Sequence, residues 1–192
     1  MRIVTAITGA SGALYAQRFI QGLVAADVEV HLIISPAGRR LLHDELGLES
    51  PNLESLAGTA EHRITLHNFN DIGATIASGS FLHDGMVIVP CSSNTLGLVA
   101  HGIGSSLISR AAAVTLKERR KLILAHREMP LSAIDVNNYK IISDAGAIIA
   151  PCNPGLYLNP TSVTDIADFV AAKLLDLVGV EHSLSKRWDP KA

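Results

Sequence analysis

The sequence predicts an α/β protein, a Rossmann-like three-layer α/β/α sandwich built on a mainly parallel sheet. Short, largely apolar runs alternate along the chain with longer segments of helical hydrophobic spacing. Runs of this kind are typical of parallel strands, because such strands are buried on both faces. Several runs end in loops of glycine, serine or charged residues, which is where open α/β sheets bind their ligands.

The first 46 residues predict two strand-and-helix units. Residues 2–7 form a short strand that ends at the sequence TGASG, and residues 13–25 carry the spacing of a helix. Residues 29–34 form a second strand. A proline just beyond this strand starts the next helix, which we expect over residues 39–46.

The middle of the chain is less regular before the alternation resumes. Residues 47–58 are polar and turn-rich, residues 64–66 fit a short strand, and residues 71–77 allow no assignment. Residues 86–89 form a clearly buried strand. A polar loop follows it, and then an apolar helical stretch, broken by glycine, that runs to residue 103.

The alternation continues through the second half of the chain. Residues 106–119 predict a helix, residues 122–125 a strand, residues 137–145 a helix and residues 147–150 the last strand. Because strands and helices follow one another throughout, we expect right-handed crossovers around a single sheet.

A proline-rich loop over residues 152–160 leads into the last helix. This helix is expected over residues 163–178, with Ser162 or Thr161 as its N-cap. The tail from about residue 181 looks irregular. The length and the absence of a linker predict one domain over residues 1–192.

Composition and charge exclude several kinds of partner. The 16 basic residues nearly balance the 18 acidic ones, and a net charge of −2 gives no general attraction to nucleic acid. No apolar run approaches the roughly 20 residues of a membrane span, and no export signal opens the chain. We therefore expect a soluble, cytoplasmic protein with no nucleic acid or membrane partner. Only 18% of residues are charged and small residues are plentiful, which suits a homo-oligomer with buried subunit faces.

Two loops after predicted strands carry neutral hydrogen-bonding groups. The loop from Thr8 to Gly12 lacks the full dinucleotide-binding motif, but its glycines allow close backbone approach and Ser11 offers a hydroxyl. It is either an anion- or cofactor-binding loop or a tight turn without a ligand. The second loop holds four consecutive polar residues, Ser92, Ser93, Asn94 and Thr95. They suit a phosphate or a polyol chain, although helix capping explains one or two of them.

Charged residues surround the strand at residues 122–125. The sequence KERRK leads into it, and Arg127 and Glu128 follow it directly. Charge beyond the carboxyl end of a buried strand indicates ligand binding, whereas such runs are also typical of solvated helix ends. Candidates for phosphate binding are Arg110, Lys117, Arg119, Arg120 and Arg127, of which some are expected to be merely solvated. Glu128 is either a proton-transfer group or an ion-pair partner of Arg127, and the second role is the more common.

Two further residues near the C-terminus are candidates for ligand contact. Tyr157 lies in the proline-rich loop, where it either reaches a ligand or anchors the loop by packing. Lys173 lies among apolar residues of the last helix and either projects into the same pocket or extends into water.

Metal and hydrolase chemistry are not predicted. The eight histidines include no metal-binding spacing, and His101 and His126 lie near element ends, where single histidines are commonly structural. Cys91 and Cys152 also lack metal-type spacing, and they fit a reducing compartment. No G-x-S-x-G motif is present, and Ser11 has no evident histidine and acid partners.

Four segments together closely resemble the UbiX family of flavin prenyltransferases, and the resemblance spans nearly the whole chain. They are TGASG at 8–12, PCSSNTL at 90–96, SRAAAVTLKERRKLILAHREMPLS at 109–132 and the loop around Tyr157. The third segment is the most specific. The first two also resemble the related flavin-binding cysteine decarboxylases.

The resemblance implies a defined reaction. A flavin-binding domain would join the dimethylallyl group of dimethylallyl monophosphate to N5 and C6 of reduced FMN, without a metal. The product, prenylated FMN, would serve a UbiD-type decarboxylase. Family members assemble into large oligomers, dodecamers among them, with flavin sites at subunit contacts.

The resemblance also implies roles for individual residues. The flavin would be held by Gly9, Ala10, Ser11, Ser35, Ser92, Ser93, Asn94, Thr95 and Arg127. The prenyl phosphate would be surrounded by Arg110, Lys117, Glu128, Tyr157 and Lys173. Catalytic roles would fall to Glu45 and Glu128 in proton handling and to Ser11 near the reacting flavin. Arg119, Arg120 and Lys121 would then face solvent.

One position departs from the family pattern, and three function classes are weighed. Lys173 stands where family members have arginine, which keeps the charge but loses the bidentate fork. The alternatives to prenyl transfer are an FMN-dependent cysteine decarboxylase and a non-catalytic flavin-binding subunit. The cations favour prenyl transfer, because a decarboxylase need not hold a second phosphate and would use an early histidine, for which His43 is poorly placed.

Overall fold

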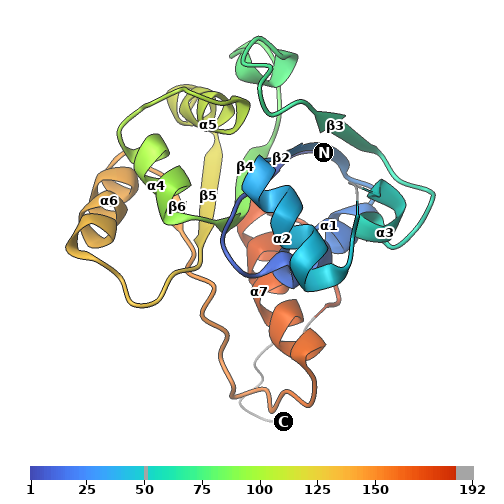
Figure 1. Ribbon diagram of the computed structural model, residues 1–192. Helices are drawn as coiled ribbons and strands as arrows, with labels where there is room; N and C mark the ends of the chain where they lie inside the picture. The colour runs from blue at the N-terminus through green and yellow to red at the C-terminus, as the bar shows by residue number, and fades with distance from the viewer. Residues whose placement is uncertain (50–51, 185–192) are drawn as a thin grey trace.

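The computed structural model describes residues 1–49 and 52–184, and its centre is a six-stranded parallel sheet (Figure 1). The strands are β1 (Arg2–Ile7), β2 (Glu29–Ile34), β3 (Ile64–His67), β4 (Gly85–Cys91), β5 (Lys121–His126) and β6 (Ile148–Ile149). They lie in the order β3-β2-β1-β4-β5-β6, and every adjacent pair is parallel. This is the Rossmann-like architecture that the sequence predicts.

Helices cover both faces of the sheet, as Figure 1 shows. One layer contains α1 (Ala13–Ala25), α2 (Pro36–Leu46), the short α3 (Leu53–Ala57) and α7 (Val163–Val178). The other contains α4 (Ser93–Ala100), α5 (Leu107–Lys117), α6 (Ala133–Asp144) and the 3₁₀ turn η1 (Thr75–Ala77). The three layers therefore match the predicted sandwich.

Two hydrophobic cores hold the layers together. Successive residues of a central strand point to opposite cores: Val87 of β4 packs with the α1 and α7 layer, and Ile88 packs with the α4 and α5 layer. Both side chains are fully buried. Burying a side chain of this size contributes roughly 1.5–3 kcal/mol, so the apolar runs of the sequence are the main source of stability.

Helix boundaries differ from the prediction where capping residues decide them. The helix expected from residue 137 begins at Ala133, because Ser132 and Asp135 form a reciprocal capping box. Likewise α2 begins at Pro36, since the Ser35 hydroxyl accepts a hydrogen bond from the Gly38 amide at 3.0 Å. For α7 the cap is Ser162.

Short elements occupy segments in which the sequence predicted none. Asn52 caps the five-residue α3 inside the segment predicted as turns, and η1 lies inside the unassigned segment 71–77. The helix after β4 ends at Ala100 rather than at residue 103. These elements are too brief for hydrophobic periodicity to reveal them.

The C-terminal end of the described chain adds little regular structure. Residues 181–184 contain no helix or strand, and the rest of the predicted irregular tail, residues 185–192, lies outside the described residues. Among the described residues, no helix is both long and apolar enough to cross a membrane.

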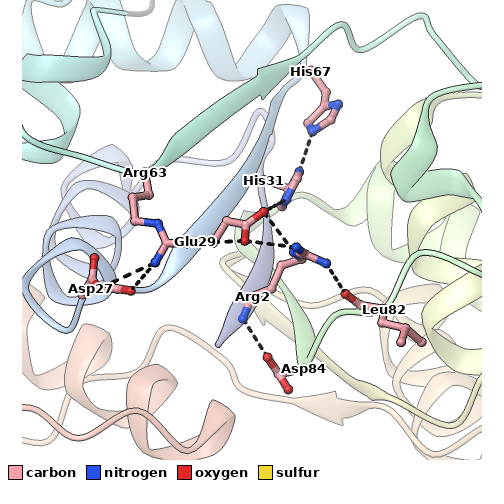
Figure 2. Close-up of polar contacts among 8 residues, drawn as sticks. All are labelled: Arg2, Asp27, Glu29, His31, Arg63, His67, Leu82 and Asp84. Carbon is pink, nitrogen blue, oxygen red and sulfur yellow. Dashed lines mark hydrogen bonds and ion pairs between the residues drawn. The ribbon is translucent and has the colours of Figure 1, made fainter.

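A network of charged side chains lies over the first residues of β1 and β2, at the amino edge of the sheet (Figure 2). Arg2 binds both carboxylate oxygens of Glu29, at 3.0 and 3.1 Å, and Glu29 also contacts His31 at 2.9 Å. The chain of contacts continues from His31 to His67, again at 2.9 Å, while Arg63 approaches Glu29 from the other side at 3.8 Å. We call these five residues the amino-edge network.

Candidate functional site

Loops that follow five strands, β1 to β5, meet at the carboxyl edge of the sheet and enclose a cavity of about 400 Å³. β1 and β4 are neighbours there, and the connections leave them toward opposite ends of the sheet, which makes this the point where α/β sheets bind ligands. The cavity is lined by Thr8, Gly9, Ser35, Ala37, Phe69, Ser92, Ser93, Asn94, Thr95, Leu98, Ser106, Ile108, Ser109 and Glu128. More than half of these residues carry a neutral hydroxyl or amide side chain, and the rest of the wall is largely apolar.

The glycine loop is tied to the loop after β4. The Thr8 hydroxyl donates to the Pro90 carbonyl at 2.8 Å and accepts from the Ser92 amide at 2.9 Å. Gly12 has a φ of 130°, which L-residues rarely adopt. At Gly9 a Cβ atom would lie 2.4 Å from the Cβ of Ala37, so glycine lets the loop pack directly on α2. The predicted flavin-binding Gly9 and Ser92 thus lie together.

Glu45 performs a structural task in the same loop. Its exposed carboxylate, on α2, accepts hydrogen bonds from the backbone amides of Gly12 at 3.0 Å and Ala13 at 2.8 Å. These amides begin α1, so Glu45 caps that helix and places negative charge at its positive end. The carboxylate therefore lies beside the loop of Ala10 and Ser11 and keeps α1 from offering its first amides to a ligand.

The four polar residues after β4 divide between capping and lining. Ser92 caps α4, accepting from the Thr95 amide, and its hydroxyl lies 3.1 Å from that of Thr95. Ser93 and Asn94 are the first helical residues, and their side chains line the cavity. Both interpretations of this loop are therefore needed, since one member caps the helix and all four line the cavity.

Arg127 links the ends of β5, β4 and β1. Its amide donates to the Cys91 carbonyl at 3.2 Å, and its Nε donates to the Ser11 carbonyl at 3.0 Å. The guanidinium thus lies against the glycine loop, 116 residues away in the chain. Of the candidate cations, it is the one that the fold brings directly to the loop of Gly9 to Gly12.

Glu128 is an exposed carboxylate in the cavity wall. One oxygen accepts from the Met129 amide at 3.1 Å, and the other accepts from the Ser93 hydroxyl at a longer 3.5 Å. It makes no ion pair with Arg127 among the described contacts, although the two are adjacent in sequence. The carboxylate is therefore free to act on a ligand in the cavity.

A buried histidine stands behind this carboxylate. His126 is 1% exposed, its Nε2 lies 3.0 Å from the Ser93 hydroxyl, and its Nδ1 lies 2.8 Å from the Tyr139 hydroxyl. Burial lowers the pKa of His126, with Asp135 and Glu128 opposing that shift. The sequence favoured a structural role for His126, and the only signal of its contact with the cavity was a titratable residue ending an apolar strand.

Helix α5 contributes residues that the sequence did not single out. Ser106 and Ser109 form a capping box at its start and also line the cavity. Arg110 follows them on the exposed side of the first turn. A capping sequence predicts only where a helix starts. Ser106 and Ser109 also line the cavity because the fold places the start of α5 there.

Lys117 lies at the opposite end of α5. The helix has 11 residues and so spans roughly 16 Å, running from the cavity toward the amino edge of the sheet. There the Lys117 ammonium pairs with Glu118 at 3.2 Å and lies beside Gly79. A lysine side chain does not cover that distance, so within one chain Lys117 does not meet the cavity.

Tyr157 and Lys173 are also apart from the cavity within one chain. Tyr157 is 55% exposed and packs edge-on against Phe169 at 5.8 Å, in the loop that leads to α7. Lys173 is exposed on α7, in the other helical layer. The fold therefore gathers the predicted flavin residues and separates three of the predicted phosphate residues.

Three other predictions concern charges and cysteines. Arg119 and Lys121 face solvent as expected, but Arg120 is partly buried and donates to the carbonyls of Phe81 at 2.7 Å and Gly79 at 2.8 Å. Both cysteines are buried and free, and burial raises the pKa of Cys152 to about 12. Across residues 1–49 and 52–184, no group of three potential ligands is arranged to hold a metal ion.

Comparison with known proteins shows similarity along nearly the whole chain. The model of the Flavoprotein family matches residues 1–175. Flavin prenyltransferase UbiX from Thermoplasma acidophilum is 48% identical over 188 residues, which cover 98% of this chain and all of that protein.

Solved structures show the same fold in detail. The crystal structure of AnUbiX (PadA1) in complex with FMN and dimethylallyl pyrophosphate has a TM-score of 0.91 and 39% identity, covering 98% of this chain and 97% of its own. A dodecameric FMN-dependent UbiX-like decarboxylase from Escherichia coli O157:H7 has a TM-score of 0.91 and 38% identity, over 98% and 100% of the two chains. The FMN-dependent cysteine decarboxylase TvaF, at 16% identity, shares the fold alone.

Proposed function

Because the chain belongs to the Flavoprotein family and, within it, to the UbiX flavin prenyltransferases, we propose that its carboxyl-edge cavity is where prenyl transfer takes place. The enzyme joins a dimethylallyl group from a phosphate ester to N5 and C6 of reduced FMN, and inorganic phosphate or diphosphate leaves. The observation that carries the proposal is the cavity itself. It combines a wall of neutral donors, the Arg127 guanidinium beside it and one unpaired carboxylate, Glu128.

The donor set fits FMN. Hydroxyl and amide groups such as Ser92, Asn94 and Ser109 can donate to phosphate oxygens and exchange hydrogen bonds with a ribityl chain. Gly9 packs directly on Ala37 of α2, which places the loop backbone in the cavity wall, where it can approach a ligand closely. We propose that Ser35 and Thr95 belong to the same set and that Arg127, aligned by the Ser11 carbonyl, supplies the cationic fork.

We assign the prenyl phosphate to residues from more than one copy of the chain. Arg110 lies in the first turn of α5, close to the cavity, whereas Lys117, Tyr157 and Lys173 lie apart from it in their own chain. Their separation supports a homo-oligomer in which neighbouring copies bring these cations and the tyrosine to each cavity. A dodecameric relative supports the same proposal. Cations that gather around the leaving phosphate stabilise its developing charge.

Three residues are proposed to act at the reacting centre. Glu128 is held at the cavity wall and takes up the proton that ring closure releases. Ser11 carries its hydroxyl on the exposed glycine loop, beside the position proposed for the flavin ring. Glu45 fixes that loop by binding the Gly12 and Ala13 amides, so we assign it to loop positioning as well as to the proton handling that the family resemblance implies.

The direct test is the mass of the flavin after reaction. We expect that the protein, reduced FMN and dimethylallyl monophosphate, incubated without oxygen, yield a flavin heavier by one prenyl group. Parallel reactions with the diphosphate ester measure the preference between donors. If the flavin is unchanged and the protein instead releases carbon dioxide from a peptide that ends in cysteine, the activity is decarboxylation and not prenyl transfer.

We propose a UbiD-type decarboxylase as the recipient of the prenylated FMN. Reactivation of such an apoenzyme by the product tests this.

The shared cavity predicts complementation between two inactive variants. Lys117→Ala is expected to keep FMN bound but to lose turnover, and Glu128→Gln is expected to do the same. Co-expression of the two with different tags should produce mixed assemblies that regain activity, because some cavities receive an intact Lys117 and an intact Glu128. Mixed assemblies as inactive as either parent would mean that Lys117 does not act on a neighbour's cavity. Loss of FMN from Lys117→Ala would mean that the pocket is assigned wrongly.

A further inference from the structure

Three side chains form a continuous line of hydrogen bonds behind Glu128. The Tyr139 hydroxyl lies 2.8 Å from Nδ1 of His126, and Nε2 of the same ring lies 3.0 Å from the Ser93 hydroxyl. That hydroxyl donates to Glu128 at 3.5 Å. The line therefore begins on α6, passes through the end of β5 and the start of α4, and ends on a carboxylate in the cavity wall.

The surroundings keep the His126 ring neutral and oriented. The ring is 1% exposed, and burial lowers its pKa; Asp135 and Glu128 oppose the shift, and Arg127 adds to it. A neutral imidazole has one donor and one acceptor nitrogen, so the line points in one direction at a time. Burial also raises the pKa of Tyr139, with Cys91 of β4, Asp135 and Cys152 contributing, so its hydroxyl keeps its proton.

Fold stability does not call for this arrangement. An apolar side chain at the end of β5 would pack in the same place without a buried polar network to satisfy, and such networks are costly when any member loses its partner. His83 offers a contrast within the chain. It is also buried, but it contacts the Gly85 carbonyl at 3.1 Å and Thr115, and it lies at the amino edge, away from the cavity.

We propose that Ser93, His126 and Tyr139 are positioning residues for Glu128 and form the relay through which Glu128 exchanges its proton during prenyl transfer. The proposal rests on the proposed function, because it gives Glu128 the proton of the ring-closing step. It adds a proton path from the cavity to the partly exposed Tyr139. This path stays open when flavin and prenyl phosphate cover Glu128.

The relay moves one proton and no electrons. Protonated Glu128 gives its proton to the Ser93 oxygen while the Ser93 hydroxyl gives its own to Nε2 of His126. The imidazolium then releases the Nδ1 proton to the Tyr139 oxygen, and the original Tyr139 proton leaves to water. This leaves the ring with its proton on Nε2. After the product has left the cavity, the same path runs in reverse and restores the starting tautomer, and Glu128 releases the returned proton to solvent through the open cavity. One proton has then entered at Glu128 and one has reached solvent.

The test substitutes two residues that do not line the cavity, His126 and Tyr139, and uses a third substitution as a matched control. His126→Gln keeps a hydrogen-bonding group toward Ser93 but cannot titrate, and Tyr139→Phe removes a single oxygen. We expect kcat to fall about tenfold in both, as for an impaired proton transfer. The FMN Kd and the KM for dimethylallyl monophosphate should stay within about twofold. His83→Gln should match the wild type in every measurement.

Two readouts separate a relay from a packing role. The wild-type kcat should fall in acid, at a pH below the ordinary histidine pKa of 6.5, because the relay needs neutral His126 and burial lowers the pKa of that ring. This acidic limb should vanish in His126→Gln. Independently of activity, ¹⁵N NMR of histidine-labelled protein without flavin should show the His126 ring neutral in a preferred tautomer. Tyr139→Phe should shift that tautomer ratio, whereas His83→Gln should not.

Each outcome decides one claim. Wild-type kcat and pH dependence in both His126→Gln and Tyr139→Phe would overturn the relay while leaving prenyl transfer intact. No prenylated flavin from the wild type would instead overturn the proposed function, although the tautomer shift would still be measurable. If His126→Gln does not fold, Tyr139→Phe decides alone, since its loss of one hydroxyl leaves the packing in place.

Discussion

The two edges of the sheet use polar residues in opposite ways. At the amino edge, the charges of the amino-edge network are satisfied by one another, with Arg2 and Glu29 in direct register on β1 and β2 (Figure 2). At the carboxyl edge, neutral hydroxyls and the Glu128 carboxylate surround a cavity of about 400 Å³. A cluster of charge is therefore not in itself a sign of function. A ligand site is marked instead by polar groups that keep free hydrogen-bonding positions after their contacts within the protein are counted.

Buried histidines make the same contrast on a smaller scale. His31 contacts Glu29 and His67, all within the amino-edge network, and Phe81 packs edge-on against its ring at 4.8 Å. His126 instead contacts Ser93, which lines the cavity. The two rings are similarly buried, so burial does not distinguish them. They differ in the group at the end of each hydrogen-bond chain, and only the chain of His126 reaches the cavity.

Removing a carboxylate from the carboxyl edge is expected to have the largest effect. Glu128→Gln should lower kcat by about 100-fold or more, because general acid–base catalysis contributes at least that much. The FMN Kd should change by less than about twofold, since the amide keeps the shape of the side chain. Single-turnover kinetics with titrated FMN measure both. A kcat close to the wild-type value would show that Glu128 is not catalytic, and the functional difference between the two edges would no longer hold.

The same substitution at the amino edge should alter stability and leave activity intact. Glu29→Gln removes the charge that faces Arg2 and Arg63, and we expect a loss of about 1 kcal/mol at pH 7, because the pair is partly exposed and screened. Glu61→Gln, on an exposed loop, is the matched control and should cost almost nothing.

The pH dependence of that loss has a definite sign. Hydrogen bonds from Arg2 and His31 lower the pKa of Glu29 from 4.5 to about 2, so its stabilisation is present above pH 4.5 and disappears as the pH falls toward 2. Denaturant unfolding of wild type and Glu29→Gln at several pH values should therefore converge in acid. A constant difference across that range would show that the charge is not what stabilises the network.

The smallest effect is expected from a cation that belongs to neither edge of its own chain. Lys173→Arg replaces a point charge with a planar fork, which can bind a phosphate with two parallel hydrogen bonds. We expect a two- to threefold lower KM for the prenyl phosphate and an unchanged FMN Kd, since a cation at an exposed, partly screened position contributes only about 0.5 kcal/mol. Initial rates with mono- and diphosphate donors measure it. An unchanged KM for both donors would remove Lys173 from the phosphate site.

Much of the fold follows from local pattern alone. Apolar runs locate β1, β2, β4 and β5, and the residues just beyond them are the ones that line or border the cavity. The reason is geometric: in a parallel sheet every strand ends at the same edge, so the position of a residue after a strand predicts its place. Local pattern did not reveal α3 or η1, because one turn of helix has no periodicity to detect.

Pairings between distant segments were beyond the reach of local pattern. Arg120 looked like solvent-facing charge, but the fold brings two loop carbonyls to it. His126 looked structural until Ser93 and Tyr139 were placed on either side of its ring. Lys117 stood in the most informative motif of the sequence, yet the direction of α5 takes it to the far edge.

The α/β class, the loops that form the cavity and the family resemblance that implies FMN can all be predicted from the sequence. These depend on residue type and spacing along one stretch of chain. Only the tertiary structure decided which polar groups satisfy one another and which remain available, because that depends on strand order and helix direction. Strand order and helix direction place Glu29 beside Arg2, which binds it, and place Glu128 in the wall of an open cavity.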